Sequence, residues 1–401
     1  MIKICFITKY PPIQGGVSSR AYWQGKALGE RGNEVHIVTN SLEVEDDYKE
    51  VFDLKDTDFL PKNVFLHSTD SESNPWHIPF SHAYTERIAN LAIEVIRNHD
   101  IRIIDSNFIL PYGIAGYIAK NITGVPQILR HAGSDIGKLF KSVSYSSLFK
   151  SLFQRVDKIL TYPQLQKLFI SIRIPEDRIS IDDKVIVDTR AFIPKVDPFS
   201  LSESTDKKLT GCPIITYIGK INYYWQSKGL LELVEAAKDI KEDFLLLFVS
   251  NGRGLKDFKM LLETEGLMKK SLFLNFLPPW KIPSVIKLST CVVVPERDFP
   301  IQYHIPILPK EVMAVGKCLI LGKEIAHNQY YGDLIDKENV LLVDPKNIPG
   351  FRNVIEFVIR NPEEVAEIGR RAYETSKEVD DFNEFIDYTL EQYNSLIEYK
   401  K

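Results

Sequence analysis

Side chains suited to chemistry follow the short apolar runs of this 401-residue chain, where we expect buried strands to end. Glu311 lies in the first turn of an expected short helix, 310–315, which begins beyond the apolar run 291–294. Open α/β sheets bind ligands beyond the carboxyl ends of their strands. A carboxylate there accepts hydrogen bonds from two vicinal hydroxyls, as a ribose presents. The alternative is an acidic residue that offsets the helix dipole.

Two lysines flank a second expected strand-to-helix loop. Lys220 follows the apolar run 214–219, and Lys228 stands directly before a helix that begins after Gly229. Two ammonium groups at one loop suit a diphosphate, because they neutralise the charge that grows as a leaving group departs. Since lysines are common on surfaces, a solvated pair is the alternative. Gly252 follows the next expected strand, in FVSNGRG.

A glycine pair, Gly15 and Gly16, follows the first expected strand and precedes a helix that we expect to begin near Val17. Adjacent glycines let backbone N–H groups approach an anionic or hydroxyl-rich ligand at a helix N-terminus. They do not form the dinucleotide fingerprint GxGxxG, because no third glycine follows at its spacing. A tight turn between strand and helix is the alternative interpretation.

The stretch RHAGSDIG places three polar residues, Arg130, His131 and Asp135, at the end of another expected strand. His131 is a candidate hydrogen-bond partner for a sugar hydroxyl. Asp135 is a candidate for the same contact or for the cap of the next helix. A histidine satisfied by internal hydrogen bonds is the alternative for His131.

The elements that must position these side chains alternate between short apolar runs and helical patterns, which predicts parallel sheets with helices on both faces. The expected strands are 3–8, 34–39, 64–67, 102–105, 127–131, 158–161, 214–219, 244–249, 272–276, 291–294, 318–321 and 340–343.

Two domains of similar size account for this pattern. We expect an α/β fold with two doubly wound, Rossmann-like domains, 1–192 and 211–381, that face each other across a cleft. The stretch 193–210 between them is polar and rich in Pro and Ser, so it is the expected linker. A last amphipathic helix is expected at about 382–401.

Composition excludes several classes of protein. With 44% hydrophobic and 26% charged residues the chain is an ordinary globular protein, and its net charge of −4 argues against a nucleic-acid partner. Its four cysteines lie in or beside apolar runs without a CxxC pair, so we expect buried thiols in a reducing compartment and no metal site. There is no signal-peptide pattern and no apolar run near about 18 residues, so a cytoplasmic location is expected.

The segment 136–173 is basic and aromatic, with one acidic residue, Asp157. Such a surface can sit on anionic lipid headgroups, in a peripheral contact on the inner face of a membrane, although this pattern more often has another origin. The alternative is a set of helices with one core face and one solvated face.

Three stretches together resemble the family 4 glycosyltransferases, which have the GT-B fold. They are YPPIQGGV…LGERGNEVHIVTN, IDSNFILPYGIAGYIAKNITGVPQILRHAGSD and KEVMAVGKCLI, in the family's order and at compatible spacing. The resemblance covers nearly the whole chain. It implies that the last helix crosses back onto the first domain.

The resemblance also implies roles for single residues. The candidate catalytic residues are His131, at the reacting sugar, with Lys220 and Lys228 on the diphosphate. The candidate donor-binding residues are Gly15, Gly16, Lys220, Lys228, Gly252, Tyr303, His304 and Glu311, of which Glu311 would bind the ribose. The acceptor-side candidates are Arg130 and Asp135.

The implied reaction moves a sugar from a nucleotide-diphosphate-sugar to a saccharide, lipid-linked or small-molecule acceptor, in polysaccharide or glycoconjugate biosynthesis. It retains the anomeric configuration and needs no metal or cofactor. Tyr303 departs from the family, which usually has a glutamate there, near the donor sugar, and Glu296 and Asp298 are the candidates to replace it. The alternatives are a nucleotide-sugar epimerase on the same fold and a non-catalytic GT-B binding subunit.

Overall fold

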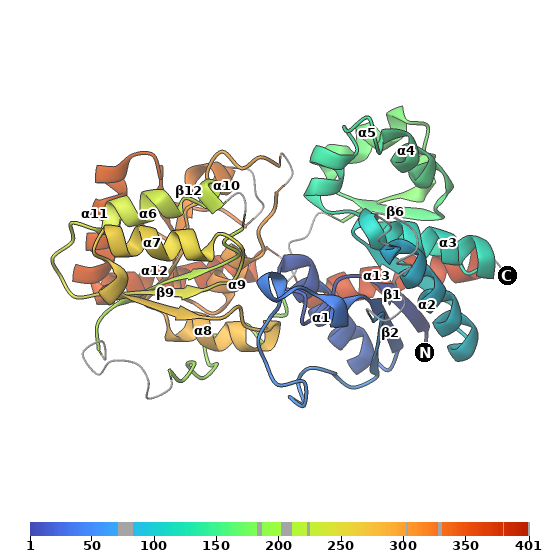
Figure 1. The fold of residues 1–401 in the computed structure, drawn as a ribbon, viewed down its shortest axis with the longest axis horizontal. Coiled ribbons are helices and arrows are strands. Elements are labelled where there is room, and N and C mark those ends of the chain that lie inside the picture. The colour runs from blue at the N-terminus through green and yellow to red at the C-terminus, as the bar shows by residue number, and fades with distance from the viewer. Residues whose placement is uncertain are drawn as a thin grey trace.

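Two parallel β-sheets with helices on their faces form the protein, as the ribbon of the computed structural model shows (Figure 1). The structure describes residues 1–70, 83–182, 187–201, 211–222, 225–301, 304–327, 331–379 and 381–399. In that part of the chain one sheet has seven strands, in the order β3-β2-β1-β4-β5-β6-β7, and the other has six, in the order β10-β9-β8-β11-β12-β13. The predicted doubly wound α/β architecture is confirmed.

The first sheet consists of β1 (Lys3–Ile7), β2 (Glu34–Thr39), β3 (Val64–Ser68), β4 (Ile103–Asn107), β5 (Gln127–Arg130), β6 (Lys158–Thr161) and β7 (Ile179–Ile181). The second consists of β8 (Ile214–Ile218), β9 (Leu245–Val249), β10 (Ser271–Leu274), β11 (Cys291–Val294), β12 (Cys318–Gly322) and β13 (Leu341–Val343). Strands β9, β11 and β12 are buried along their whole length, because helices cover both faces of a parallel sheet.

The helices around the first sheet are α1 (Gly16–Glu30), α2 (Tyr84–His99), α3 (Ile114–Thr123), α4 (Ser146–Arg155) and α5 (Gln166–Ser171). Those of the second half are α6 (Leu230–Ala237), α7 (Leu255–Thr264), α8 (Ile282–Leu288), α9 (Leu308–Ala314), α10 (Lys323–His327), α11 (Ile348–Arg360) and α12 (Pro362–Lys377). The last helix is α13 (Phe382–Tyr399). None of the described helices is both long enough and apolar enough to cross a membrane.

Helix α13 lies against the first sheet, next to α1 and on the opposite side of the molecule from α12 (Figure 1). Its Tyr393 hydroxyl donates a hydrogen bond to Asp105 of β4, 2.6 Å away and fully buried. Gln392 accepts one from Lys158 Nζ at 3.0 Å. The C-terminal helix therefore packs on the half of the molecule in which the chain begins.

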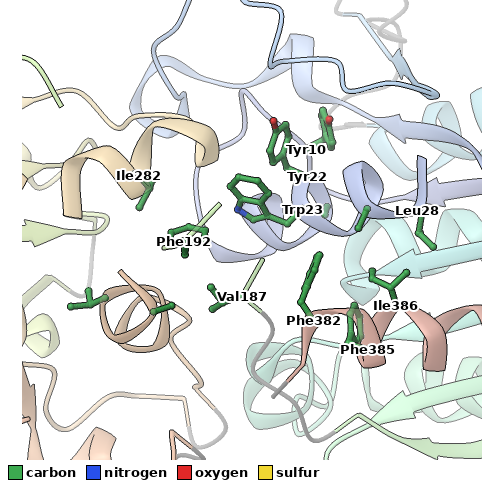
Figure 2. Close-up of a cluster of buried hydrophobic side chains, with 14 of the residues drawn as sticks. Tyr10, Tyr22, Trp23, Leu28, Val187, Phe192, Ile282, Phe382, Phe385 and Ile386 are labelled. Atoms are coloured by element: carbon green, nitrogen blue, oxygen red, sulfur yellow. The ribbon is translucent and has the colours of Figure 1, made fainter. Parts of the chain in front are cut away.

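An aromatic and aliphatic cluster joins the two halves (Figure 2). Trp23 of α1 packs against Phe192, with ring centroids 5.6 Å apart, and Phe382 of α13 and Ile282 of α8 belong to the same buried cluster. Polar contacts reinforce this junction: the Asn251 side-chain amide donates to the Asp46 carbonyl oxygen at 2.7 Å. Of the expected linker 193–210, residues 202–210 lie outside the described part of the chain, and the domain boundaries stay predictions.

The strand order changes direction at β1 and β4 in the first sheet and at β8 and β11 in the second. Loops on the two sides of such a point run to opposite faces of the sheet, which leaves a crevice beyond the carboxyl ends of the strands. The two crevices meet, because the residues that follow these four strands line one cavity.

Candidate active site

A cavity of about 550 Å³ opens between the two halves of the molecule. Its walls come from the loop between β1 and α1, from residues that follow β4 and β5, and from residues that follow β8 and β11, with the first turn of α9. This volume lies in the range of small-molecule sites. The cavity therefore lies at the place where a doubly wound fold binds its ligands.

Most of the residues selected from the sequence meet in this cavity. Its lining includes Gly15, Gly16, His131, Lys220, Lys228, His304 and Glu311. Arg130, Asp135 and Gly252 do not line it. Tyr303 lies outside the described residues.

Glu311 is buried in the cavity wall, with 7% of its surface exposed, in the first turn of α9. Within the described part of the chain its carboxyl group accepts no hydrogen bond, and burial alone raises its pKa to about 8. A buried carboxyl group without partners costs free energy, which a ligand with hydroxyl donors recovers. The local sequence explains its position, because Pro309 pre-sets the first helical turn.

Lys220 follows β8 and meets the glycine pair of the opposite half. A Cβ atom on Gly15 would lie 2.5 Å from Lys220 Nζ, and Gly15 has a φ of +117°, so a side chain is excluded there. Burial, with smaller contributions from Lys9 and Lys228, lowers the pKa of Lys220 to about 7, while Glu50 opposes them. A negative ligand between the two halves would therefore favour the protonated form of Lys220.

Lys228 belongs to a compact group with Glu296, His304 and Phe299. Its ammonium donates to one oxygen of Glu296, and His304 Nε2 lies 2.7 Å from the other. The Phe299 ring stacks on His304 with centroids 3.8 Å apart, and Lys228 Nζ lies 4.4 Å from its centre. Burial alone would raise the pKa of Glu296, but Lys228 and His304 outweigh it and lower that pKa to about 2.

The same group separates the two candidates for the missing acidic residue. Glu296 lines the cavity, whereas Asp298 is half exposed and pairs with Arg297 and Lys346 at 2.9 and 2.8 Å. Of the two carboxylates, Glu296 is therefore the one within reach of a ligand in the cavity.

His131 follows β5 and is buried in the opposite wall. Its Nε2 lies 2.7 Å from Thr161 Oγ1, and burial lowers its pKa to about 4, so the ring is neutral near pH 7. The internal hydrogen bond fixes the orientation of the ring. A neutral, fixed imidazole can form a hydrogen bond to a sugar hydroxyl but does not supply a positive charge.

The two acceptor-side candidates are engaged inside the protein. Arg130 donates from Nε to Asp105 at 3.0 Å and from Nη1 to Asp182 at 3.1 Å. Asp135 accepts backbone N–H groups from Ile109 and Ala132, at 3.1 and 2.8 Å, and burial raises its pKa to about 6. The geometry supports a structural role for both residues and gives neither of them a contact with the cavity.

Gly252 packs against Asn222, a residue of the cavity wall, and does not line the cavity itself. Its φ is +137°, and a Cβ atom there would lie 2.3 Å from Asn222 Oδ1. Asn222 itself lines the cavity, so Gly252 allows close packing of a loop that carries a lining residue. This is an indirect position, not the ligand contact expected from the sequence.

Three charged residues of the cavity were not predicted from the sequence, Lys9, Arg20 and Glu50. Glu50 is 2% exposed, and burial raises its pKa well above the ordinary value although Lys220 opposes this. Its Oε2 atom has no hydrogen-bond partner among the described residues. Glu50 is one of several acidic residues in EVEDDYKE, and no periodicity distinguishes it from its neighbours.

Residues 203–375 match the family model described as glycosyl transferases group 1. This part of the chain, in the second half, is therefore similar to that family. The resemblance predicted from the sequence is confirmed for the GT-B fold by solved structures, and the family likeness extends over residues 203–375.

Curated relatives and solved structures agree with this likeness. N-acetyl-alpha-D-glucosaminyl L-malate synthase of Bacillus anthracis is 25% identical over 156 residues, which is 38% of this chain and 37% of that protein. Sucrose-phosphate synthase from Thermosynechococcus elongatus has a TM-score of 0.71 and 15% identity, with all of both chains covered. HepE of Anabaena, in complex with UDP and glucose, has a TM-score of 0.68 and 15% identity, covering 98% of this chain and 100% of that one.

Proposed function

We propose that this protein transfers a sugar from a nucleotide-diphosphate-sugar to an acceptor hydroxyl. The observation that carries the proposal is Glu311, a buried carboxyl group in the cavity wall that accepts no hydrogen bond from the described part of the chain. A ribose presents two hydroxyl donors at a spacing that matches the two oxygens of the Glu311 carboxyl group. Binding the ribose would therefore pair a group whose isolation otherwise costs free energy.

Lys220 and Lys228 would hold the diphosphate. Both line the cavity that Glu311 faces, and both flank the loop between β8 and α6. Their ammonium groups would stabilise the negative charge that grows on the departing diphosphate, which is work that a metal ion performs in other enzymes. A transfer that is independent of added metal is part of the proposal, and so is retention of the anomeric configuration.

The reacting sugar would lie between Glu296 and His131, on opposite walls of the cavity. Glu296 is ionised and held by Lys228 and His304, so it would accept hydrogen bonds from sugar hydroxyls. Positioning and exclusion of water would account for most of the rate enhancement.

A nucleotide screen tests the proposal most directly. UDP-sugars come first, because HepE of Anabaena was solved with UDP and glucose. Free nucleotides and nucleotide-sugars that bind the folded protein should raise its Tm in a thermal-shift assay. If no nucleoside diphosphate or nucleotide-sugar raised the Tm, the proposal would be wrong.

Incubation with the bound donor then separates the alternatives. Transfer requires a saccharide, lipid-linked or small-molecule acceptor, whereas an epimerase changes the sugar with no second substrate. A binding subunit would bind the donor tightly without turnover on any acceptor of a broad panel. NMR of the product linkage would show whether the anomeric configuration is retained.

For the segment 136–173 we propose contact with anionic lipid. Most of its phenylalanines are core residues, since Phe149, Phe153 and Phe169 are buried. Val143 and Leu148 are 96% and 47% exposed, on a surface that also carries exposed lysines. Exposed apolar side chains beside lysine ammonium groups suit the headgroup region of an anionic lipid bilayer.

Sedimentation with phosphatidylglycerol vesicles, compared with phosphatidylcholine vesicles, tests this contact. The double variant Val143→Asp, Leu148→Asp should lose most of the bound fraction. Met260→Asp, at a position that is 49% exposed in the second half, is the matched control and should bind as the wild type does. Equal binding by all three proteins would contradict the lipid contact.

A further inference from the structure

Three histidines gather outside the cavity, on the face of the first sheet that α2 covers. His36 comes from β2, His67 from β3, and His99 is the last residue of α2. Each offers one ring nitrogen, and the three nitrogens lie within 4.8 Å of one another. The sequence separates these residues by 31 and 32 positions, so no local motif announces the cluster.

Strand register explains why the rings meet. His36 and Val38 point to the same face of β2, because side chains two positions apart on a strand share a face. Val38 is the neighbour of His67 across the β2–β3 pair. The C-terminal end of α2 then brings His99 over this face, where its ring lies 4.2 Å from that of His36, between centroids.

The hydrogen bonds of His36 fix which of its nitrogens is available. Its Nε2 lies 2.8 Å from Glu34 Oε1, and because an ionised carboxylate only accepts, Nε2 carries the proton. Its Nδ1 therefore presents a lone pair, directed at His67 Nε2, 2.9 Å away. A histidine held by a carboxylate on one nitrogen and open on the other is the arrangement that metal sites use to orient a ligand.

The environment also disfavours protonation of two of the rings, those of His36 and His67. Burial lowers the pKa of His36 although Glu34 opposes this. Burial, together with His36 and His99, lowers the pKa of His67 to about 4. Neutral imidazole is the form that binds metal ions. Lys3, whose Nζ lies 3.7 Å from Glu34 Oε1, is the charged group closest to this carboxylate on the same strand pair.

We propose that His36, His67 and His99 bind one divalent transition-metal ion, with Glu34 orienting His36. Three imidazoles and a fourth, open position suit Zn²⁺, which takes nitrogen ligands at about 2.0–2.1 Å in a tetrahedral arrangement. Two such nitrogens lie about 3.3 Å apart. The observed 2.9 Å between His36 and His67 therefore needs a small outward rotation of His67, which is partly exposed.

The bound ion would join three elements at the edge of the first sheet. β3 is the outermost strand there, paired on one side with β2, and α2 packs across both. A metal bond from each of β2, β3 and α2 would hold this edge together. The expected consequence is structural, because none of the three histidines lines the cavity.

Competition with a chromophoric zinc chelator tests the site, on the full-length chain without a polyhistidine tag. We expect one Zn²⁺ per wild-type chain. His67→Asn and His99→Asn should each weaken binding at least about 100-fold, and Glu34→Gln about 10- to 100-fold, the usual cost of losing an outer-shell partner. His327→Asn, at an exposed position on α10 of the other half, is the matched control and should bind as the wild type does.

His67 and His99 are chosen because both are partly exposed, so the metal-free variants should keep the wild-type circular dichroism spectrum and Tm. Zn²⁺ should then raise the Tm of the wild type and of His327→Asn, but not the Tm of His67→Asn or His99→Asn. Anomalous scattering at the zinc edge should place the ion among the three rings. Binding with no loss in His67→Asn and His99→Asn, or no stoichiometric binding by the wild type, would overturn the proposal, whatever the outcome of the nucleotide screen.

Discussion

The two walls of the cavity use charge in different ways. On the wall built by the second half, the side chains of Glu311 and Lys220 have no hydrogen-bond partner in the described chain, and Lys228 and Glu296 pair with each other at the cavity surface. In the first half, Arg130 lies behind the wall and donates to two buried carboxylates, while Lys9 and Glu50 are charged residues of the wall itself. Most of the charged groups that we propose for donor binding therefore lie on the second wall.

This difference explains why the donor is easier to infer than the acceptor. A nucleotide-diphosphate-sugar carries fixed charges and a ribose, which require complementary charged groups that stand out in the structure. Beside Lys9 and Glu50, the wall of the first half presents neutral groups such as His131 and the Gly15–Gly16 backbone. Neutral hydrogen-bonding groups suit many hydroxyl-bearing acceptors and select none of them by charge.

The largest expected effect concerns the first half, at Arg130, which lies behind the cavity wall. Arg130→Ala would leave Asp105 and Asp182 buried with one charge partner fewer, and breaking a buried pair in this way typically costs about 3–5 kcal/mol of folding free energy. Urea unfolding measures the loss. Arg370→Ala, which removes an exposed arginine of α12, is the control and should change stability little.

The milder variant Arg130→Lys keeps the charge and separates structure from acceptor binding. It should lose part of the stability while the acceptor KM stays close to that of the wild type. A large rise in the acceptor KM with wild-type stability would show that Arg130 contacts the acceptor, and the contrast between the walls would fail.

Glu296 should give the next largest effect. Its folded-state pKa of about 2 lies below the ordinary 4.5, so its carboxylate contributes stability that is present above pH 4.5 and lost as the pH falls through 2. Glu296→Gln should therefore reduce the free energy of unfolding at pH 7 by on the order of 3 kcal/mol. The gap between variant and wild type should close between pH 4.5 and 2.

Urea unfolding at a series of pH values measures this dependence. Glu367→Gln is the comparison, because Glu367 pairs with two arginines on the exposed face of α12, where solvent screens the charges. A gap that stayed constant with pH would show that Glu296 does not titrate as its partners Lys228 and His304 require.

Glu311 should affect binding more than folding. Its raised pKa of about 8 means that the folded protein loses stability as the pH rises from 4.5 through 8, so Glu311→Gln should not lower the Tm at pH 7.5. Ribose hydroxyls donate to the ionised form and would favour it, so loss of these hydrogen bonds in Glu311→Ala should weaken nucleotide binding about 10- to 150-fold. Isothermal titration calorimetry measures that change.

Glu364→Ala is the matched control for Glu311, because Glu364 also lies in the first turn of a helix, α12, but is exposed. If Glu311 did no more than offset a helix dipole, both variants would lose a few tenths of a kcal/mol of stability and neither would lose nucleotide affinity.

Sequence patterns predicted most of the strands and the positions where they end. Both depend on which residues of a short segment are buried, and this shows in the local order of apolar residues. The apolar runs that became β9, β11 and β12 are examples, and Glu311 and Lys220 were found because each stands next to such a run. β7, with the three residues Ile179–Ile181, is too short for a periodic signal, so its strand was missed. The sequence predicts least where partners are distant.

Arg130 shows this limit clearly. Its partners Asp105 and Asp182 lie 25 and 52 positions away, so the sequence gives no sign that its charge is already used inside the protein. Glu50 shows the converse, a loop acid that becomes a cavity residue because its segment folds against the second half, where Val51 N–H donates to the Phe276 carbonyl oxygen at 2.9 Å. Both errors arise from contacts between distant parts of the chain.

The smallest expected effect is at Asp298, two positions beyond Glu296 in the same loop. Asp298→Asn should leave donor KM and kcat within about twofold of the wild type, because its partners Arg297 and Lys346 lie at the solvent-exposed surface and not in the cavity. Steady-state kinetics beside Glu296→Gln make the comparison direct. A strong loss of turnover in Asp298→Asn with wild-type kinetics in Glu296→Gln would reverse the assignment and place the sugar-contacting acid on the exposed side of the loop.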